Sequence, residues 1–310
     1  WFLDTARRER QYALADNTTA EKALTHLNLL DGVQPTHACV LLFGRAPQHF
    51  LPASEIKCMH FHGTEVRKPI PSYQVYKGTA FDLVDQAVDF AMSSLTRSVG
   101  TRARGPRAPV EYELPKDAVA EALVNAVAHR DYTSNASAQV MLFSDRLEVW
   151  NPGELPPGLT PERLLQPHAS IPRNPLICEP LFLAHYIEKA GTGTLDMAAQ
   201  CRQSDLPEPD FEQREGQFVV TLWRDWLTPH ELDALGVTER QSHVLLAVKS
   251  KGRLTNAEYQ KISGVLRKTA ARDLSDLVGK GVLKQVGTGR GSHYIVRRKR
   301  AKNRTMGVCT

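Results

Sequence analysis

Hydrophobic and polar positions follow two different periods along the chain. Apolar residues recur at helical spacing in TAFDLVDQAVDFAMSSLTRSV, where Thr79 is the expected N-cap, and in EALVNAVAHRDY. The segments SAQVMLF and RLEVWN instead alternate with a period of two and are separated by Ser144-Asp145, which predicts a β-hairpin. Helices and strands interspersed in this way indicate an α/β fold.

The other segments before residue 228 extend this pattern. Helices are predicted in TTAEKALTHLNLLD, in LICEPLFLAHYIEKAG and from GTGT through Cys201. Strands are predicted in HACVLLFG, EIKCMHFHG and VEYEL, and a strand pair in PDFEQREGQFVVTLW. Between residues 151 and 175 the chain is rich in Pro and turn residues. Loops of this length are usually functional lids or disordered segments.

One predicted helix carries a polar stripe in an otherwise apolar sequence. Glu121, Asn125 and His129 follow one another at intervals of four, and Asp117 precedes them on the same spacing. At 3.6 residues per turn these side chains lie on one face of the helix. A polar face on a buried helix requires partners, which belong either to the protein or to a ligand.

A purely structural network is one interpretation of this stripe. Arg130 and Asp131 would pair beside it, and Arg173 and Asn174 in IPRNP would close the network across the helix. The alternative is a binding site, and the two interpretations stay open on the residues alone.

The C-terminal part predicts a small module of three helices and a β-hairpin. The helices are TERQSHVLLAVKSKG, with Thr238 as N-cap, TNAEYQKISG and VLRKTAARDLSDLVGKG. The hairpin is VLKQVGTGRGSHYIVRR, with a basic, Gly-rich tip. In the third helix Leu266, Ala270, Leu274 and Leu277 share one face, which we expect to pack into the core.

Composition adds a strong asymmetry of charge. Apolar residues make up 42% and charged residues 24%, as in soluble globular proteins, and no apolar run approaches the length of a membrane span. The five scattered cysteines form no C-x-x-C pair, which favours a reducing cytoplasm without a zinc site. Residues 229–310 contain 17 Lys+Arg and 6 Asp+Glu, a net charge of +11, whereas the preceding residues carry a net charge of −6. This asymmetry predicts nucleic-acid binding, with a solvated face and disordered basic tail as the alternative.

The pair E-x-x-x-N formed by Glu121 and Asn125, followed by glycine loops, resembles the ATP-binding helix of the gyrase, histidine-kinase and MutL (GHKL) ATPase superfamily. There the Glu is the general base that orients the attacking water, and the Asn ligates Mg²⁺ on the phosphates. The resemblance implies ATP and Mg²⁺ as cofactors, with Glu121 catalytic and Asn125 at both the nucleotide and the metal. The phosphate-binding loop of the superfamily is matched by Gly191, Thr192, Gly193 and Thr194.

The adenine-binding motif of the superfamily, D-x-G-x-G, is replaced here by the stretch NPGEL. Asn151 and Gly153 therefore occupy expected nucleotide-binding positions. Asn accepts the hydrogen bond of the adenine amino group through its amide oxygen but lacks the charge of Asp. The chain has no G-x-x-x-x-G-K-[ST] motif, so no Walker-type motor is expected.

The resemblance extends to the order of domains. Residues 110–224 are similar to the branch often labelled "ATP-dependent DNA helicase RecG C-terminal" in bacterial transcriptional-regulator-like proteins. This implies a GHKL-type α/β sandwich over residues 67–228, a mixed sheet with helices on one face. Residues 1–66 resemble the last part of an AlbA-like, Schlafen-type α+β domain. Residues 229–297 resemble a winged helix-turn-helix, which a basic tail at 298–310 follows.

The winged-helix resemblance implies double-stranded DNA as a partner. Basic side chains at the start of a recognition helix suit phosphates and guanine edges, and homodimers commonly read two half-sites. Winged helices also serve protein contacts, which is the alternative. The expected DNA-binding residues are Arg267, Lys268, Thr269 and Arg272 on the helix and Lys284, Arg290 and His293 on the wing.

Together these inferences predict a cytoplasmic, DNA-binding transcriptional regulator that does not enter a membrane. Its middle domain would be a degenerate or ligand-sensing nucleotide site, and ligand binding under the lid would shift the winged helix. The alternative from another class is a slow Mg-dependent ATPase, acting through Glu121 in DNA processing or phage defence. His129 has no place in the superfamily pattern, and we interpret it as structural or regulatory.

Overall fold

The computed structural model describes the chain except residues 16, 96, 100–109, 189–190, 226 and 297–310. The chain divides into two compact units, Trp1–Asp225 and Trp226–Thr310. This division lies beside the expected boundary at 228–229. Residues before and after the expected boundary at 66–67 fall into the same unit, because strands from both sides pair in one sheet. The family assignments of these parts stay predictions.

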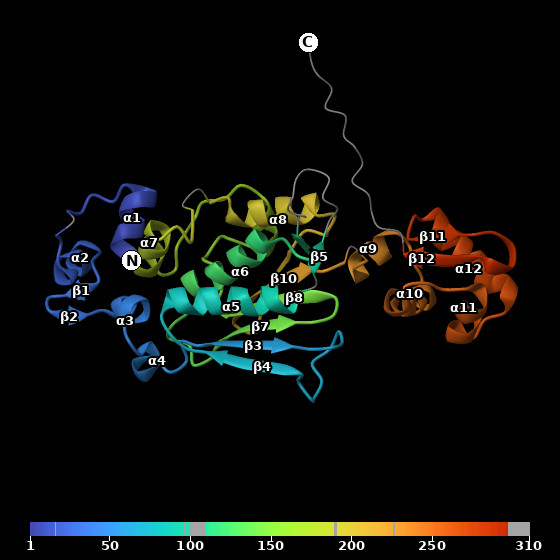
Figure 1. Cartoon of the computed structure of the whole chain (residues 1–310), viewed down its shortest axis with the longest axis horizontal. Coiled ribbons are helices and arrows are strands. Elements are labelled where there is room, and N and C mark those ends of the chain that lie inside the picture. Colours follow the sequence, from blue (N-terminus) through green and yellow to red (C-terminus); the bar gives the residue numbers. More distant parts are fainter. Residues whose placement is uncertain (16, 96, 100–109, 189–190, 226, 297–310) are drawn as a thin grey trace, which may run out of the picture. The chain divides into compact units, whose positions relative to one another are not determined.

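A six-stranded mixed sheet organises the first unit, in the strand order β4-β3-β7-β8-β10-β9. The pair β3 and β7 is parallel and the other neighbouring pairs are antiparallel. This mixed sheet with its helices confirms the predicted α/β class (Figure 1). The strands are β3 (Ile56–His60), β4 (Ser72–Tyr76), β7 (Ala138–Leu142), β8 (Arg146–Pro152), β9 (Asp210–Arg214) and β10 (Gln217–Trp223).

Helices α5 (Ala80–Ser94) and α6 (Lys116–Ala128) pack on one face of this sheet. Cys58, Val140 and Val149 are aligned in register on neighbouring strands and belong to the same buried core as both helices. Alternate residues of a strand point to opposite faces, so one row of apolar side chains holds the helices. The other elements of this unit are α1 (Phe2–Arg10), α2 (Ala20–His26), β1 (Leu30–Asp31), β2 (Gln34–Pro35), α3 (His37–Phe43), α4 (Pro47–Phe50), β5 (Arg97–Val99), β6 (Val110–Tyr112), η1 (Pro161–Leu165), α7 (Pro175–Leu183) and α8 (Gly193–Gln203).

The predicted N-cap of α5 is confirmed. The Thr79 side chain accepts a hydrogen bond from the backbone N–H of Asp82 (3.2 Å), and the Asp82 carboxylate accepts one from the N–H of Thr79 (2.8 Å). This reciprocal capping box satisfies two N–H groups that a helix start leaves open. The helix ends at Ser94, earlier than predicted, because the following residues form β5 and pair with β6.

The strand predicted for HACVLLFG is wrong, since these residues form the helix α3. The Thr36 hydroxyl accepts a hydrogen bond from the N–H of Cys39 (3.2 Å) and caps the helix. Cys39, Leu41 and Leu42 are buried in the main core. A short apolar run fits a buried strand and a buried helix equally well, so its pattern alone does not decide between them.

The second unit contains the predicted series of three helices and a hairpin. Thr238 is the N-cap of the first of these helices, with a full capping box to Gln241. Leu266 departs from the prediction: its side chain is 81% exposed, whereas Leu274 and Leu277 are buried. Leu266 is the N-cap residue and has extended backbone angles, so it lies outside the helical stripe. The elements are α9 (Pro229–Ala234), α10 (Glu239–Lys251), α11 (Asn256–Ser263), α12 (Arg267–Gly279), β11 (Leu283–Val286), η2 (Gly289–Gly291) and β12 (His293–Val296).

Within the described ranges, no helix combines the length and the apolar character needed to cross a membrane.

Candidate functional site

A cavity of about 460 Å³ lies in the first unit, against α6, β8, β10 and the start of α8. Its volume is within the range of small-molecule sites. Among the nucleotide-site residues predicted from the sequence, Thr192 is exposed at the N-cap of α8 and does not line the cavity. The fold brings the others together around one space, although they come from three separate segments. They are Glu121, Asn125, Asn151, Gly153, Gly191, Gly193 and Thr194.

Glu121 and Asn125 lie one turn apart on the cavity face of α6. The Asn125 amide nitrogen donates a hydrogen bond to the Glu121 carboxylate (2.9 Å), which leaves the amide oxygen of Asn125 available as a ligand. Burial raises the pKa of Glu121, the hydrogen bond from Asn125 opposes this rise, and the charge of Asp196 adds to it. A carboxylate with a raised pKa is a stronger base and better suited to accept a proton.

Gly193, the first residue of α8, lies directly against this carboxylate. A Cβ atom at Gly193 would overlap a carboxylate oxygen of Glu121. Gly191 has a φ of +70°, and a Cβ there would come within 2.9 Å of the His168 carbonyl oxygen. Both glycines of the GTGT loop are thus needed for close packing around the cavity.

Asn151 lies on β8 and is 5% exposed. Its amide oxygen has no hydrogen-bond partner among the described residues. Val149, Phe218 and Val220 form an apolar wall of the same cavity. A buried oxygen without a donor is energetically costly in a protein, so this one is a candidate acceptor for a hydrogen bond from a ligand.

The predicted lid segment between β8 and α7 is ordered over the cavity by Arg173. Its guanidinium pairs with the Asp131 carboxylate (2.9 Å) and donates to the carbonyl oxygen of Glu154 (3.1 Å). The backbone N–H of Arg173 donates to Nδ1 of His129 (3.5 Å). Burial lowers the pKa of His129, and the charge of Arg173 lowers it further, so both favour the neutral ring that accepts this hydrogen bond. His129 also lines the cavity.

Two more contacts attach the lid at its C-terminal end and in its middle. The Asn174 amide nitrogen donates to the carbonyl oxygens of Ala128 (2.9 Å) and Arg130 (2.8 Å), at the C-terminal end of α6. The Thr194 hydroxyl donates to the carbonyl oxygen of Leu164 (2.7 Å) in η1. Arg173 and Asn174 therefore close across the end of the helix, as the sequence predicted.

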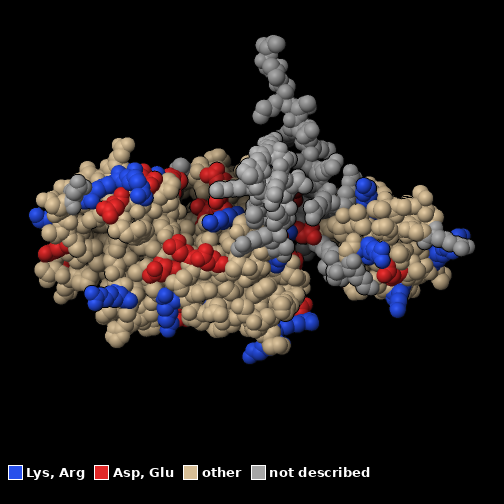
Figure 2. Space-filling model, viewed as in Figure 1, with Lys and Arg blue, Asp and Glu red and all other residues tan. Residues whose placement is uncertain are grey.

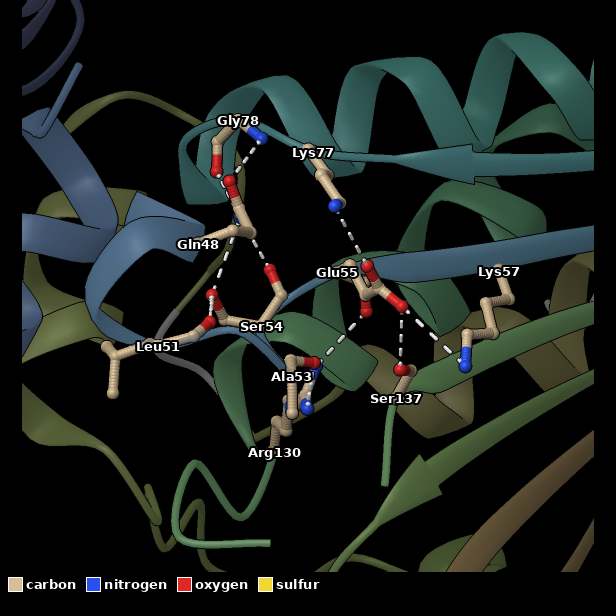
Figure 3. A network of polar contacts seen from close by, with 10 residues as sticks. All are labelled: Gln48, Leu51, Ala53, Ser54, Glu55, Lys57, Lys77, Gly78, Arg130 and Ser137. Atoms are coloured by element: carbon tan, nitrogen blue, oxygen red, sulfur yellow. Dashed lines mark hydrogen bonds and ion pairs between the residues drawn. The ribbon is translucent and has the colours of Figure 1, made fainter. Parts of the chain in front are cut away.

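The predicted pairing of Arg130 with Asp131 is not what the structure shows. The buried Arg130 guanidinium donates to the carbonyl oxygens of Ala53 (2.5 Å), Glu55 (3.2 Å) and Ala136 (2.6 Å), and Figure 3 shows it reaching the segment before β3. Asp131 instead faces Arg173. The two side chains do not pair, because Arg130 donates to buried backbone carbonyls and Asp131 pairs with Arg173 of the lid.

The Glu55 carboxylate continues this network on the other side of Arg130. It accepts a hydrogen bond from the Ser137 hydroxyl (3.1 Å) and lies 3.6 Å from the Lys57 amine and 3.8 Å from the Lys77 amine (Figure 3). The network ties β3 to the chain that follows α6, where the Arg130 carbonyl oxygen accepts the hydrogen bond from Asn174 of the lid. Sequence reasoning missed Glu55, because its partners are distant along the chain and no local pattern marks it.

The second unit presents the predicted DNA-contact residues on α12 and β11. Arg267, Lys268, Arg272 and Lys284 are exposed, and Thr269 is half-buried. Figure 2 shows separate Lys and Arg side chains on the surface of this unit. On the wing, His293 is half-buried, and the side chain of Arg290 lies outside the described residues. Of the predicted helix residues, Arg267, Lys268 and Arg272 are thus accessible on α12.

A buried carboxylate that the sequence did not reveal anchors α12. Asp273 is 5% exposed and accepts hydrogen bonds from the Arg240 guanidinium (3.0 Å) and the Tyr259 hydroxyl (3.0 Å). Burial, followed by the bond to Asp273, raises the pKa of Tyr259 to about 12. These bonds join the three helices of the unit and hold α12 in one orientation.

The described residues contain no cluster of three His, Cys, Asp or Glu side chains that could hold a metal ion. Cys39, Cys58, Cys178 and Cys201 are buried thiols without a disulfide bond, and Cys309 lies outside the described residues.

A family comparison bears on the first unit. Residues 135–222 match a family model described as "Putative ATP-dependent DNA helicase recG C-terminal", of the HATPase type. This match includes Asn151 and the GTGT loop and begins after Glu121 and Asn125. No curated protein matches the chain.

The fold is similar to the crystal structure of the DIP2311 protein from Corynebacterium diphtheriae, with a TM-score of 0.58. The two chains are 20% identical, and the match covers 95% of this chain and 60% of that one. At this identity the likeness concerns the fold alone. The present chain spans about 60% of the length of that structure.

Proposed function

We propose that this chain is a DNA-binding transcriptional regulator whose first unit binds an adenine nucleotide in the cavity. The observation that carries the proposal is the unpartnered amide oxygen of Asn151, which lines the same cavity as Glu121, Asn125 and the start of α8. In the matched HATPase-type region, this position lies near the end of strand β8 and precedes the glycine loop. A nucleotide would supply the donor that the buried oxygen lacks.

The described residues fit ATP and Mg²⁺ by their chemistry. The Asn151 oxygen would accept a hydrogen bond from the adenine amino group, while Val149 and Phe218 contact the ring. Backbone N–H groups at the start of α8 would bind phosphate. Asn125 would hold Mg²⁺, which neutralises phosphate charge when bound.

The DNA-binding half of the proposal is supported by charge and exposure. Residues 229–310 carry a net charge of +11, and Arg267, Lys268 and Arg272 are exposed on α12. Among the described residues, none of these three forms an ion pair. We extend the proposal to a homodimer on double-stranded DNA, because paired recognition helices read two half-sites. The nucleotide regulates DNA affinity only if it binds one conformation better than the other.

The test is calorimetric titration of MgATP into the wild type, Asn125→Ala and the surface control Lys22→Ala. Lys22 is exposed on α2, away from the cavity. We expect binding to the wild type and the control and loss of binding in Asn125→Ala. If none of the three proteins binds any adenine nucleotide, the ligand-binding part of the proposal is wrong. A duplex-DNA titration beside it tests the regulator part.

A second candidate function, a slow Mg-dependent ATPase in DNA processing or phage defence, is favoured by the position of Glu121. Its buried carboxyl lies at the start of α8 and has a raised pKa, as a general base requires. Glu121→Gln should then abolish phosphate release and leave DNA binding unchanged. Equal phosphate release by the wild type and the variant would exclude this role for Glu121.

A further inference from the structure

Leu266 is an apolar side chain that the second unit leaves in water. It is 81% exposed, and no other large apolar side chain among the described residues of this unit is as accessible. The helix that follows already has a complete packing face, because Ala270, Leu274 and Leu277 are fully buried. Leu266 therefore contributes nothing to the core and is available to a partner.

The backbone around Leu266 is fixed on both sides. Gly264 ends α11 with a φ of +69°, and Val265 packs against the core of the unit. After Leu266, Asp273 ties α12 to the other two helices through Arg240 and Tyr259. A side chain held outward by a rigid turn loses little conformational entropy when it binds.

The surface beside Leu266 is basic. Arg267, Lys268 and Arg272 are exposed, and they make no ion pair with any described residue. The acidic side chains of α12 are already engaged, Asp273 by Arg240 and Asp276 by Lys280 (2.8 Å). The partner of this surface must therefore combine dense negative charge with a small apolar spot.

Duplex DNA has both properties. Its phosphates attract the Lys and Arg side chains, and the C5-methyl group of thymine is the apolar feature of the major groove. An anionic membrane fits less well, because a single leucine buries too little apolar area in a bilayer interface. The charge complementarity of the surface thus selects DNA.

We propose that Leu266 contacts a thymine methyl group in the major groove and makes the chain prefer thymine at one position of its site. This inference rests on the proposed DNA binding and adds a specificity determinant to it. Arg267 and Lys268 would hold the backbone phosphates on either side. Leu266, the exposed N-cap residue of α12, then contributes to the sequence specificity of DNA binding.

The experiment uses the full chain and a pool of duplexes with a randomised centre. Wild type, Leu266→Ala, Leu266→Met and the control Val33→Ala each select duplexes from the pool. Val33 is 86% exposed in the first unit and matches Leu266 as an accessible apolar residue. In the duplexes that the wild type selects, each thymine is then replaced in turn by deoxyuridine, which removes only the methyl group.

We expect one thymine position at which deoxyuridine weakens wild-type binding about fourfold, the factor for one buried methyl group. The same loss should persist in Val33→Ala, remain in part in Leu266→Met and vanish in Leu266→Ala. If Leu266→Ala keeps the full fourfold loss, or if no thymine position responds, the inference is wrong while DNA binding stands. If Leu266→Ala changes only the self-association of the chain, the surface binds protein and the inference is also wrong. Failure of the wild type to bind any duplex would overturn the proposed regulator function as well.

Discussion

At the scale of single residues, the most informative feature is that two side chains in the cavity, those of Asn151 and Glu121, are held in energetically unfavourable states. The amide oxygen of Asn151 is buried without a donor, and burial disfavours the charged form of Glu121. An unsatisfied buried polar group costs about 1–3 kcal/mol. Groups with perturbed energetics in a cavity are typical of functional sites. A substitution at either position is therefore expected to affect the free energy of unfolding differently from ligand binding.

The first prediction concerns Asn151→Leu, which replaces the orphaned amide by an apolar side chain of similar size. We expect the free energy of unfolding to rise by about 1 kcal/mol, because the unsatisfied oxygen is removed. Affinity for MgATP should fall about tenfold, because the acceptor for the adenine amino group is lost. Urea unfolding and calorimetry measure the two effects. Gln200→Leu is the matched control, since Gln200 has an orphaned amide oxygen outside the cavity.

The second prediction concerns the pH dependence of stability in Glu121→Gln. The folded state raises the pKa of Glu121 above its usual value of 4.5. Below that pH the carboxyl is protonated in both states, and its stabilising contribution is lost as the pH rises through the folded-state pKa. The variant cannot ionise, so its stability relative to the wild type should increase from pH 4 to pH 8. Urea midpoints across this range measure it, with the exposed Glu154→Gln as control. A constant difference would contradict the burial of this charge.

The lid lines the cavity and is attached by three side chains. Contacts of Arg173, Asn174 and Thr194 attach it to α6, to the chain after α6 and to α8. The ion pair between Arg173 and Asp131 is partly exposed, because 37% of the Arg173 side chain is accessible. Solvent therefore weakens this ion pair. The other two attachments involve backbone carbonyls, with Thr194 bonded to Leu164 in the middle of the segment and Asn174 bonding from its C-terminal end. The start of the lid, where the Glu154 carbonyl accepts from Arg173, should therefore depend most on Arg173.

The third prediction concerns amide hydrogen exchange in the lid of Arg173→Ala. Removing the pair with Asp131 and the bond to the Glu154 carbonyl should speed exchange at residues 154–173 about two- to fivefold, as for an exposed ion pair of ~0.5–1 kcal/mol. Exchange in α5 should not change. Arg163→Ala is the control, because Arg163 is exposed on the same lid. Equal exchange in both variants would show that Arg173 does not hold the lid.

For the whole molecule, the two units differ in charge. Residues 229–310 carry a net charge of +11 and the preceding residues one of −6. A polyanion is therefore attracted to the second unit, and salt should weaken this attraction strongly. The proposed nucleotide site and the proposed DNA-binding surface accordingly belong to different units of the chain.

The fourth prediction concerns the salt dependence of duplex binding. The logarithm of the affinity should fall linearly with the logarithm of the salt concentration. Lys268→Ala should weaken binding to all duplexes alike and reduce the slope by about 1, because one phosphate contact is lost. Lys22→Ala, exposed in the first unit, should keep the wild-type slope. Fluorescence anisotropy between 50 and 300 mM salt measures it, and an unchanged slope in Lys268→Ala would exclude this contact.

Several elements were predictable because their signals are local. The caps at Thr79 and Thr238 and the hairpin of β7 and β8 are set by residues close together in the sequence. The E-x-x-x-N spacing likewise placed Glu121 and Asn125 on one face of α6. The helix α3 was not predictable, because a short apolar run indicates that the segment is buried but does not distinguish a helix from a strand.

The sequence by itself determined which residues could face one another on α6, where α8 begins and where positive charge accumulates. Only the tertiary structure decided that the Asn151 oxygen is left without a donor, that Arg130 serves backbone carbonyls instead of Asp131, and that Leu266 stays in water. The physical reason is range: caps, turns and helical faces depend on neighbours within a few residues. Burial and hydrogen-bond satisfaction depend on segments that meet only when the chain has folded.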